Sequence, residues 1–354
     1  MKPLNTASIH CRLLRWYERE KRDLPWRKNR DPYRVWLSEI MLQQTRVEAV
    51  IPYYQRFLSH FPTVKELAEA DLDSINNLWA GLGYYSRARN LHSAAKQILQ
   101  LHLGKFPRTK EELLELKGIG PYTAAAIASI AFDQPCCALD GNLERVFSRL
   151  LAFRGNPKSG EGRKALLAFG ENLVALGKPG LVNQAVMDLS SAYCHPRSPN
   201  CTACPIASLC DSRKLGIQEQ VPMKKSRKEK IFLDAKAWVV LHQGKILLAK
   251  RAPGQWLAGI WDIPWRIEEK DKEFVSPSFG EERATCSLER TITKHKISFS
   301  VQALACEKMP TKKEISSMQA DAAEYRWVSL DELHGVNLPR PSEKALEILL
   351  NKLS

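Results

Sequence analysis

The stretch that most constrains how this chain of 354 residues can fold is the segment 109–140, TKEELLELKGIGPYTAAAIASIAFDQPCCALD. Thr109 followed by Glu112 is typical of a capping box, so a helix is expected to begin there. That helix cannot continue through the turn that holds Gly118 and Gly120, because glycines two apart allow positive φ and a close approach of another segment. The proline after the turn suits the first position of a second helix. The segment therefore predicts two short helices joined by a glycine hairpin.

A hairpin of this kind directs free backbone N–H groups outward at the start of its second helix, which suits a phosphate. An ordinary connection between two packed helices has the same pattern, so the hairpin by itself leaves both interpretations open. Asp140 closes the segment and precedes apolar residues with helical spacing, which predicts that it is a helix N-cap.

The charge of the chain favours a polyanionic partner, because the formal net charge is +14. A general basic bias of the proteome is the alternative. No apolar run approaches the roughly 18 residues that a membrane span needs, and the charged N-terminus lacks the apolar core of a signal peptide. We therefore expect an intracellular, cytoplasmic protein with no membrane partner. The nine cysteines are then expected to be thiols or metal ligands.

Four of the cysteines form the most specific local pattern in the chain. Cys194, Cys201, Cys204 and Cys210 are separated by six, two and five residues. Four thiols within 17 residues predict a compact loop that a single centre holds together. A structural zinc ion and an iron–sulfur cluster both take four thiolates, and the spacing favours neither.

The first two-thirds of the chain is expected to be helical, and the last third is not. Helices are predicted over 8–22, from 32 onward, and over 46–60, 63–80, 86–102, 109–116, 161–177 and 180–194. Residues 213–230 are polar and basic and predict a linker. After the linker the pattern changes to strands, with a final helix, so an α+β domain is predicted over 231–354.

Two features of the helical part are ambiguous when they are read alone. Glu39 and Gln43 are four residues apart on the helix that begins at Pro32, so they share a face beside an apolar stripe. Glu39 could equally lie at the edge of that stripe in solvent. Tyr84 lies in a glycine turn, where an aromatic can wedge between bases or simply pack the loop.

Taken together, these motifs resemble the MutY-type adenine DNA glycosylases of the endonuclease III superfamily over essentially the whole chain. The motifs are LPWR at 24–27, PYRVWLSEIMLQQTRV at 32–47, GLGYYSRARNL at 81–91, LKGIGPYTAAAI at 116–127, LDGNLERV at 139–146 and NQAVMDLSSAYC before the cysteine loop. The resemblance implies a multidomain chain: an all-α helix-hairpin-helix glycosylase domain with an iron–sulfur cluster loop, followed by an α+β Nudix-like domain. Its parts are 1–212 with the hairpin at 109–132 and the cysteine loop at 194–210, the basic linker 213–230, and a MutT-like (Nudix-fold) lesion-recognition domain at 231–354.

The resemblance also implies an activity, a cofactor and a partner. The family excises adenine opposite 8-oxoguanine or guanine in double-stranded DNA, and its cysteine loop holds a [4Fe–4S] cluster, which resolves zinc against iron–sulfur. A monomer is expected. Bifunctional relatives carry a lysine where this chain has Tyr122, so little or no strand cleavage is expected. The alternatives are an endonuclease III-like glycosylase/lyase on damaged pyrimidines and a non-catalytic DNA-binding protein with a structural metal.

By resemblance, Glu39 protonates adenine and Asp140 stabilises the oxocarbenium-like sugar, so Glu39 is expected in the more apolar environment. Tyr122 and Asn142 are expected to hydrogen-bond around the sugar site and Asp140. The remaining residues expected to contact substrate or DNA are Arg22, Trp26, Arg27, Gln43, Gln44, Thr45, Tyr84, Gly118, Gly120, Gln184, Lys294 and His295.

The C-terminal domain departs from the family at two places. Neither Glu268-Glu269 nor Glu281-Glu282 has the Arg-Glu pair that precedes the Glu-Glu pair of the fold's hydrolase motif, so no nucleotide hydrolysis is expected. The family reads 8-oxoguanine with a Phe-Ser-His turn, and Thr293-Lys294-His295 stands in that place here. A lysine there is expected to approach the lesion pair or a phosphate.

Overall fold

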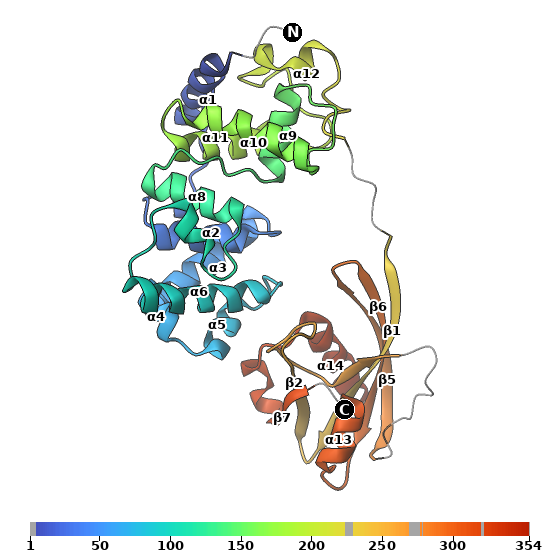
Figure 1. Ribbon diagram of the computed structural model, residues 1–354. Coiled ribbons are helices and arrows are strands. Elements are labelled where there is room, and N and C mark those ends of the chain that lie inside the picture. Colours follow the sequence, from blue (N-terminus) through green and yellow to red (C-terminus); the bar gives the residue numbers. More distant parts are fainter. Residues whose placement is uncertain (1–4, 224–228, 269–276, 278, 320–321, 354) are drawn as a thin grey trace. The chain divides into compact units, whose positions relative to one another are not determined.

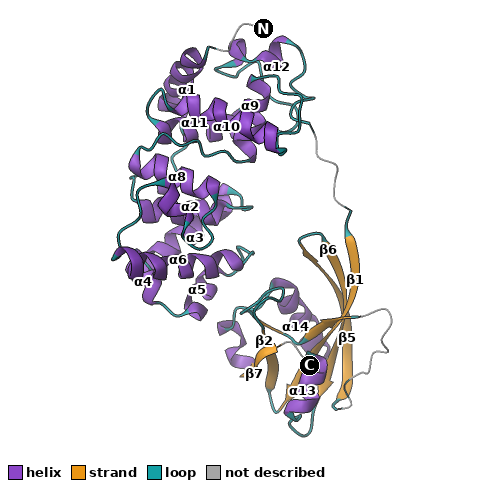
Figure 2. Cartoon of the chain, in the orientation of Figure 1, coloured by secondary structure: helices purple, strands orange, loops and turns teal. Residues whose placement is uncertain are grey.

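The computed structural model describes residues 5–223, 229–268, 277, 279–319 and 322–353. Part of the predicted linker, 224–228, and Glu269 lie outside the described residues. The chain divides into two compact units, which are Met1–Ala70 with Arg89–Ser226, and Asp71–Ala88 with Arg227–Ser354. The first unit is helical and the second is rich in strands (Figures 1 and 2).

The helical unit packs long amphipathic helices around an apolar core. Its elements are α1 (Thr6–Glu20), η1 (Pro25–Arg27), α2 (Pro32–Leu42), α3 (Val47–His60), α4 (Val64–Glu69), most of α6 (Ser86–His102), α7 (Lys110–Leu114), α8 (Pro121–Phe132), α9 (Gly141–Leu150), α10 (Gly160–Val174), α11 (Pro179–Ala192), η2 (Ala207–Leu209) and α12 (Asp211–Lys214). Buried apolar residues of α1, α9, α10 and α11 form one continuous hydrophobic core. The helix α8 packs against α2 on one side and α11 on another, which places three distant parts of the sequence side by side.

Two boundaries of the helical part differ from the sequence prediction. The single helix expected over 63–80 is two helices, α4 and α5 (Leu72–Trp79), because Asp71 is a new N-cap whose Oδ1 accepts the Ser74 amide at 2.7 Å. The linker predicted from residue 213 begins later than expected. Ile217 and Val221 are buried, and the Val221 carbonyl accepts the Arg149 Nε–H at 2.9 Å, so this stretch packs on the helical unit.

The strand-rich unit is a mixed sheet with a helix on each face. Its strands are β1 (Ile231–His242), β2 (Lys245–Arg251), β3 (Trp261–Asp262), β4 (Trp265–Ile267), β5 (Glu281–Ile292), β6 (His295–Ala305) and β7 (Ala322–Ser329). Their order is β3-β2-β1-β6-β5, with β4 paired to β1 and β7 paired to β2, and only the β1–β6 pair among them is parallel. The expected turn between β1 and β2 is present, with positive φ at Gln243 and Gly244.

Two of the helices of this unit, α14 and α13, cover opposite faces of the sheet. The final helix α14 (Arg340–Leu353), which the sequence predicted, packs on alternate residues of β1 and β6 such as Ala237 and Val301. The helix α13 (Lys312–Met318) packs on Trp238 and Val240, which point to the other face. Sequence reasoning missed α13, although its capping box was a readable signal. Among the described helices, none has the length and apolar character needed to cross a bilayer.

Candidate active site

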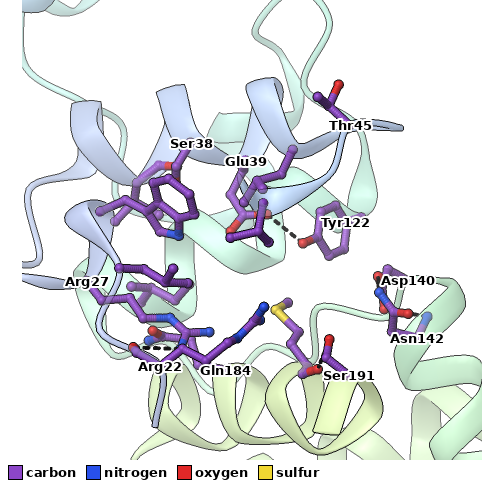
Figure 3. Close-up of a pocket in the computed structure, with 17 residues that line it drawn as sticks. Arg22, Arg27, Ser38, Glu39, Thr45, Tyr122, Asp140, Asn142, Gln184 and Ser191 are labelled. Carbon is purple, nitrogen blue, oxygen red and sulfur yellow. Dashed lines mark hydrogen bonds between the residues drawn. The ribbon is translucent and has the colours of Figure 1, made fainter. Parts of the chain in front are cut away.

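A polar cavity opens between α2, α8, α11, the start of α9 and the chain before α2 (Figure 3). Its volume is about 190 Å³. Nine of the residues predicted from the sequence line it together, which are Arg22, Trp26, Arg27, Glu39, Thr45, Tyr122, Asp140, Asn142 and Gln184. The structure therefore brings both predicted catalytic carboxylates and most of the predicted base-contacting residues to one site.

Glu39 lies on α2, which begins where Asp31 caps the helix by accepting the Arg34 amide at 3.1 Å. The side chain is only 6% exposed, so it does not lie at a solvent-facing edge. Burial raises the pKa of the Glu39 carboxyl to about 7, a nearby Asp140 adds to that effect, and the Tyr122 hydrogen bond and the Arg27 charge oppose it. A carboxyl with this pKa can hold and donate a proton near neutral pH.

Asp140 is the N-cap of α9, as the sequence predicted. Its Oδ1 accepts the backbone N–H groups of Asn142 at 2.9 Å and Leu143 at 2.8 Å, and its Oδ2 accepts the Asn142 side-chain amide at 2.8 Å. Burial raises the pKa of Asp140 above its usual value, although these three hydrogen bonds and the Arg145 charge partly oppose it. The hydrogen bonds fix the carboxylate in one orientation at the edge of the cavity. Asn142 therefore contacts Asp140 as expected.

Tyr122 was expected to hydrogen-bond around the sugar site and Asp140, but its partner is a different carboxyl. Its hydroxyl donates to Glu39 Oε2 at 2.5 Å across the cavity. The reason is that α8 faces α2, so the first turn of α8 points the phenol at the buried carboxyl. Burial, with the two nearby carboxylates, raises the pKa of Tyr122 well above its usual value, so the phenol stays neutral and remains a donor.

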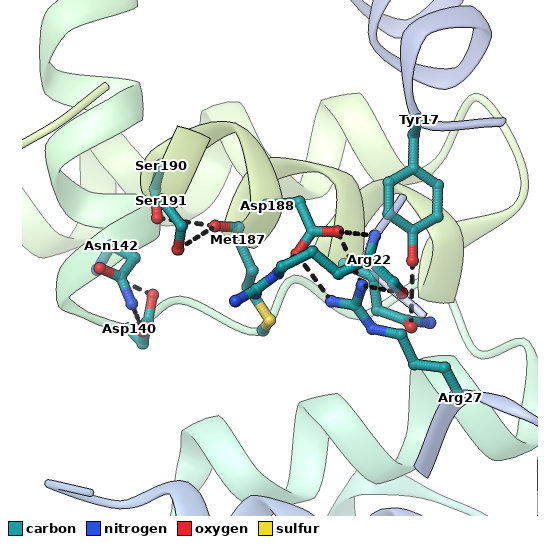
Figure 4. A network of polar contacts seen from close by, with 10 residues as sticks. Tyr17, Arg22, Arg27, Asp140, Asn142, Met187, Asp188, Ser190 and Ser191 are labelled. Carbon is teal, nitrogen blue, oxygen red and sulfur yellow. Dashed lines mark hydrogen bonds and ion pairs between the residues drawn. The ribbon is translucent and has the colours of Figure 1, made fainter. Parts of the chain in front are cut away.

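The wall of the cavity opposite Tyr122 contains an ion cluster that sequence reasoning missed. Asp188 on α11 is 2% exposed and contacts both Arg22 and Arg27 (Figure 4). Arg27 donates to the carboxylate with Nη1 at 2.7 Å and Nη2 at 2.9 Å. We name Arg22, Arg27 and Asp188 the wall cluster. Asp188 lies within the NQAVMDLSSAYC motif, but nothing local marks it, because its partners are about 160 residues away.

Gln184, also on α11, completes this wall. Its Oε1 accepts the Tyr17 hydroxyl at 3.3 Å, and its Nε2 donates to the Gly180 carbonyl at 3.2 Å. These two contacts orient the amide, which keeps a further N–H and a lone pair for a ligand. Trp26 also lines the cavity, and its indole packs edge-to-face with Tyr54, with ring centroids 5.3 Å apart, which fixes the indole in place.

The glycine turn of the hairpin does not line this cavity, and the predicted capping box is present at Thr109. Gly118 has φ +77°, and a Cβ there would meet the Cβ of Asn90 at 2.6 Å, so another segment approaches this glycine as expected. Gly120 has an ordinary φ of −95°, caps α8 without a side-chain hydrogen bond and has open space around it. The two glycines therefore differ in the space around them, because a side chain at Gly118 would collide with Asn90 and one at Gly120 would meet nothing within 4 Å.

The predicted wedge residues lie on exposed turns and share an unusual backbone. Gln44 has φ +59° and is exposed, and Tyr84, at 49% exposure, has φ +50°. Neither is a glycine, so both positions carry strain of the kind that is common in residues that contact ligands. Gln43 instead points back to α8, where its Nε2 donates to Thr123 Oγ1 at 3.4 Å.

The four predicted ligand cysteines line a cavity of their own beside α9 and α12. Arg149, buried at 3% exposure, donates to Cys194 Sγ at 3.2 Å and to the His195 carbonyl at 2.7 Å. A buried guanidinium against a thiol suits a loop of thiolates that share an anionic centre. Among the described residues, no three metal-ligating side chains converge closely enough for a single ion, so the fit rests on the shared cavity.

Lys294 and His295 belong to the strand-rich unit, at the turn between β5 and β6. Thr293 has φ +54° there, and the Lys294 side chain is exposed. The His295 ring packs on Trp256 with ring centroids 4.8 Å apart. The turn thus presents an exposed lysine side chain and a histidine whose ring packs at a tilt against Trp256.

Comparison with known protein families supports both units. Residues 37–171 match the HhH-GPD superfamily of base excision DNA repair proteins, and residues 194–210 match the iron–sulfur binding domain of endonuclease III. Residues 236–348 match the NUDIX domain. The chain is therefore a helix-hairpin-helix protein that carries a [4Fe–4S] cluster, followed by a Nudix-like domain.

Comparison with individual proteins gives the same result. The chain is 31% identical to an adenine DNA glycosylase of Buchnera aphidicola subsp. Schizaphis graminum, over 95% of this chain and 97% of that protein. It is 40% identical to the adenine DNA glycosylase of Homo sapiens over 78% of this chain, but it spans only about half (51%) of that protein's length. Among solved structures, a thermostable thymine-DNA glycosylase matches 59% of this chain and 97% of its own at 29% identity, with a TM-score of 0.55.

Proposed function

We propose that this chain, which belongs to the adenine DNA glycosylase family, excises adenine that is mispaired with 8-oxoguanine or guanine in double-stranded DNA. The observation that carries the proposal is the pair of carboxyls in one cavity: a buried Glu39 with a pKa near 7, and an Asp140 fixed by three hydrogen bonds. Two carboxyls in different environments suit two roles in cleaving a glycosidic bond.

In the proposed reaction the adenine nucleotide first leaves the stack and enters the cavity, at a cost of a few kcal/mol that is least for a mispair. Protonated Glu39 then donates its proton to a ring nitrogen of adenine. The C1′–N9 bond breaks, and its electron pair leaves with the base. Asp140 stabilises the positive charge on the sugar. Water attacks C1′, and its proton passes to a carboxylate, which completes hydrolysis to an abasic site.

The wall residues are proposed to hold the base while the bond breaks. Gln184 has an amide N–H and a lone pair available, and Arg22 and Arg27 offer guanidinium donors held by Asp188. Trp26 supplies an aromatic surface against the base. Thr45 also lines the cavity and is proposed to contact the flipped nucleotide.

The reaction is proposed to stop at base excision. A lyase needs an amine that forms a Schiff base with the sugar, and this chain has the neutral phenol of Tyr122 at that place, hydrogen-bonded to Glu39. The phenol instead is proposed to orient the Glu39 proton.

Contacts to the duplex are proposed at the exposed turns. The open backbone around Gly120 suits a phosphate at the start of α8, and the strained Gln44 and Tyr84 suit residues that fill the gap left by the extruded base. Lys294 and His295 are proposed to approach the lesion pair or its phosphates.

Cys194, Cys201, Cys204 and Cys210 are proposed as the four ligands of the cluster, because they line one cavity and span the matched iron–sulfur region. The cluster supplies a cross-link that holds the 194–210 loop together. Arg149 would neutralise part of the charge of the thiolates.

The test is an excision assay on a duplex that holds one adenine opposite 8-oxoguanine, with a second duplex that has guanine opposite the adenine. Alkali after the reaction should cleave the adenine strand, and omission of alkali should leave it intact. An adenine strand that stays intact after alkali would refute the proposal. Trapping of the protein on a damaged-pyrimidine duplex by borohydride would instead support a glycosylase/lyase.

A further inference from the structure

We propose that Asp188 is a positioning residue that sets the proton affinity of Glu39, by holding Arg22 and Arg27 in the cavity wall and cancelling one of their two charges. The inference rests on the proposed function, in which Glu39 must be protonated to act. Nothing in the chemistry of excision requires an aspartate on α11, so this role is separate from the two reacting carboxyls.

The contacts of Asp188 are those of a residue built to hold cations. Its carboxylate accepts Arg22 Nε at 2.8 Å and the Arg22 backbone N–H at 3.2 Å, and Arg22 Nη2 lies 2.6 Å away. Arg27 binds both carboxylate oxygens, at 2.7 and 2.9 Å. The aspartate is therefore buried and fully satisfied. Burial raises the pKa of Asp188, but the hydrogen bonds and charges of Arg27 and Arg22 outweigh it and hold the pKa below its usual value, so Asp188 stays ionised.

The charged groups that face Glu39 come from every element around the cavity. They are Tyr122 from α8, Asp140 at the start of α9, Arg27 from η1, Arg22 from the chain before η1, and Asp188 behind both arginines on α11. The Arg27 charge already lowers the pKa of Glu39 against the effect of burial. With Asp188 ionised, the wall cluster carries a formal charge of +1, and without it the charge would be +2.

The sign of the effect follows from this charge. A more positive wall favours the Glu39 carboxylate, so the pKa of Glu39 falls and less of the acid is protonated at neutral pH. Excision then loses rate only on the alkaline side, where protonated Glu39 is limiting. A residue that merely supports the fold would lower the rate by a similar factor at every pH.

The experiment measures single-turnover excision of adenine opposite 8-oxoguanine, with enzyme in excess, from pH 5 to pH 9. In Asp188→Asn the alkaline limb of the pH–rate profile should move down by about one pH unit, because loss of a nearby like charge has effects of this size. At pH 8 the rate should fall about tenfold, and the loss should shrink as the pH falls. A uniform loss across the range would overturn the proposal.

A second variant tests the opposite sign and does not depend on whether Asp188→Asn folds. Arg22→Gln leaves the Asp188–Arg27 pair intact and makes the wall neutral, so the alkaline limb should move to higher pH. Combining it with Asp188→Asn restores the charge of +1 and should return the limb toward its original position. An unmoved limb in Arg22→Gln would overturn the proposal whatever the double variant does.

The matched control is Asp133→Asn. Asp133 also pairs with an arginine, Arg30, at 2.5 Å, but both side chains are 55% exposed and neither lines the cavity. Its limb should coincide with that of the unmodified chain. If the unmodified chain excises no adenine, the proposed function fails. If it excises adenine but neither variant moves the limb, only this inference fails.

Discussion

Each compact unit buries an aspartate against arginine, and the two sites differ in what surrounds them. In the helical unit, Asp188 holds Arg22 and Arg27 at the wall of an open cavity. In the strand-rich unit, Asp262, with no exposed surface, accepts from Arg290 Nη1 at 3.0 Å and Trp265 Nε1 at 3.1 Å.

The second site closes on itself. Asp262 also accepts from the Ile263 amide and the Ser342 hydroxyl, and Arg290 donates to the same hydroxyl at 2.8 Å. We name Asp262, Trp265, Arg290 and Ser342 the core cluster. It joins β3, β4, β5 and α14 and lines none of the cavities described. The same kind of ion pair thus connects secondary-structure elements in the strand-rich unit and borders a cavity in the helical unit.

The largest effect is expected from a substitution of the proposed proton donor in the cavity of the helical unit. Glu39→Gln removes the proton that we propose is donated to adenine, so single-turnover excision should fall by about 10²–10⁴-fold. Affinity for the mispaired duplex should change little, because the amide keeps the size of the side chain. The measurement is excision beside a binding titration, and a variant that still excises within tenfold of the original would remove Glu39 from the mechanism.

The core cluster should show its effect in stability alone. Asp262→Asn leaves Arg290 buried without its counter-charge, which should destabilise the strand-rich unit by about 3–5 kcal/mol. The free energy of unfolding of this unit is measured by pulse proteolysis at increasing urea concentration, in which the cleavage fragments identify the unit that has unfolded. The exposed Asp133→Asn control should cost at most about 1 kcal/mol. A cost for Asp262→Asn as small as the control's would mean that the core cluster is not a structural pin.

The buried carboxyl of the cavity should make the helical unit less stable as pH rises. The pKa of Glu39 is raised to about 7 in the folded chain, so the folded state binds the proton more tightly than the unfolded state does. The stability that this tighter proton binding adds to the folded state is fully present below the unfolded pKa of about 4.3 and is lost as pH rises toward 7. The free energy of unfolding should fall by roughly 3 kcal/mol over that window. Glu39→Gln should flatten this dependence, and an unchanged slope in the variant would assign it to another group.

The smallest effects separate the two glycines of the hairpin turn by the room that each leaves for a side chain. Gly118→Ala should cost about 1–3 kcal/mol, because φ is +77° and the new Cβ would meet Asn90 at 2.6 Å. Gly120→Ala should leave unfolding nearly unchanged, since nothing lies within 4 Å, but should weaken DNA binding if a phosphate approaches there. Equal effects of the two substitutions on unfolding would contradict this division.

Much of the site was readable from the sequence because its signals are local. The N-cap at Asp140, the capping box at Thr109 and the turn at Gly118 each depend on residues within a few positions, and all three are present. The division of the helix predicted over 63–80 was also a local signal, an N-cap at Asp71, and it was missed.

What the sequence determined by itself is most of the helices and strands, the cysteine spacing and the motifs that place Glu39 and Asp140 in one family pattern. Only the tertiary structure decided which polar groups meet. The packing of the helices makes the Tyr122 hydroxyl donate to Glu39 and not to Asp140, and it places the Asp188 carboxylate where both Arg22 and Arg27 donate to it. The physical reason is that a cap or a turn is satisfied by neighbours in the chain. A buried charge is satisfied by whichever side chains the packing of helices brings within hydrogen-bonding distance.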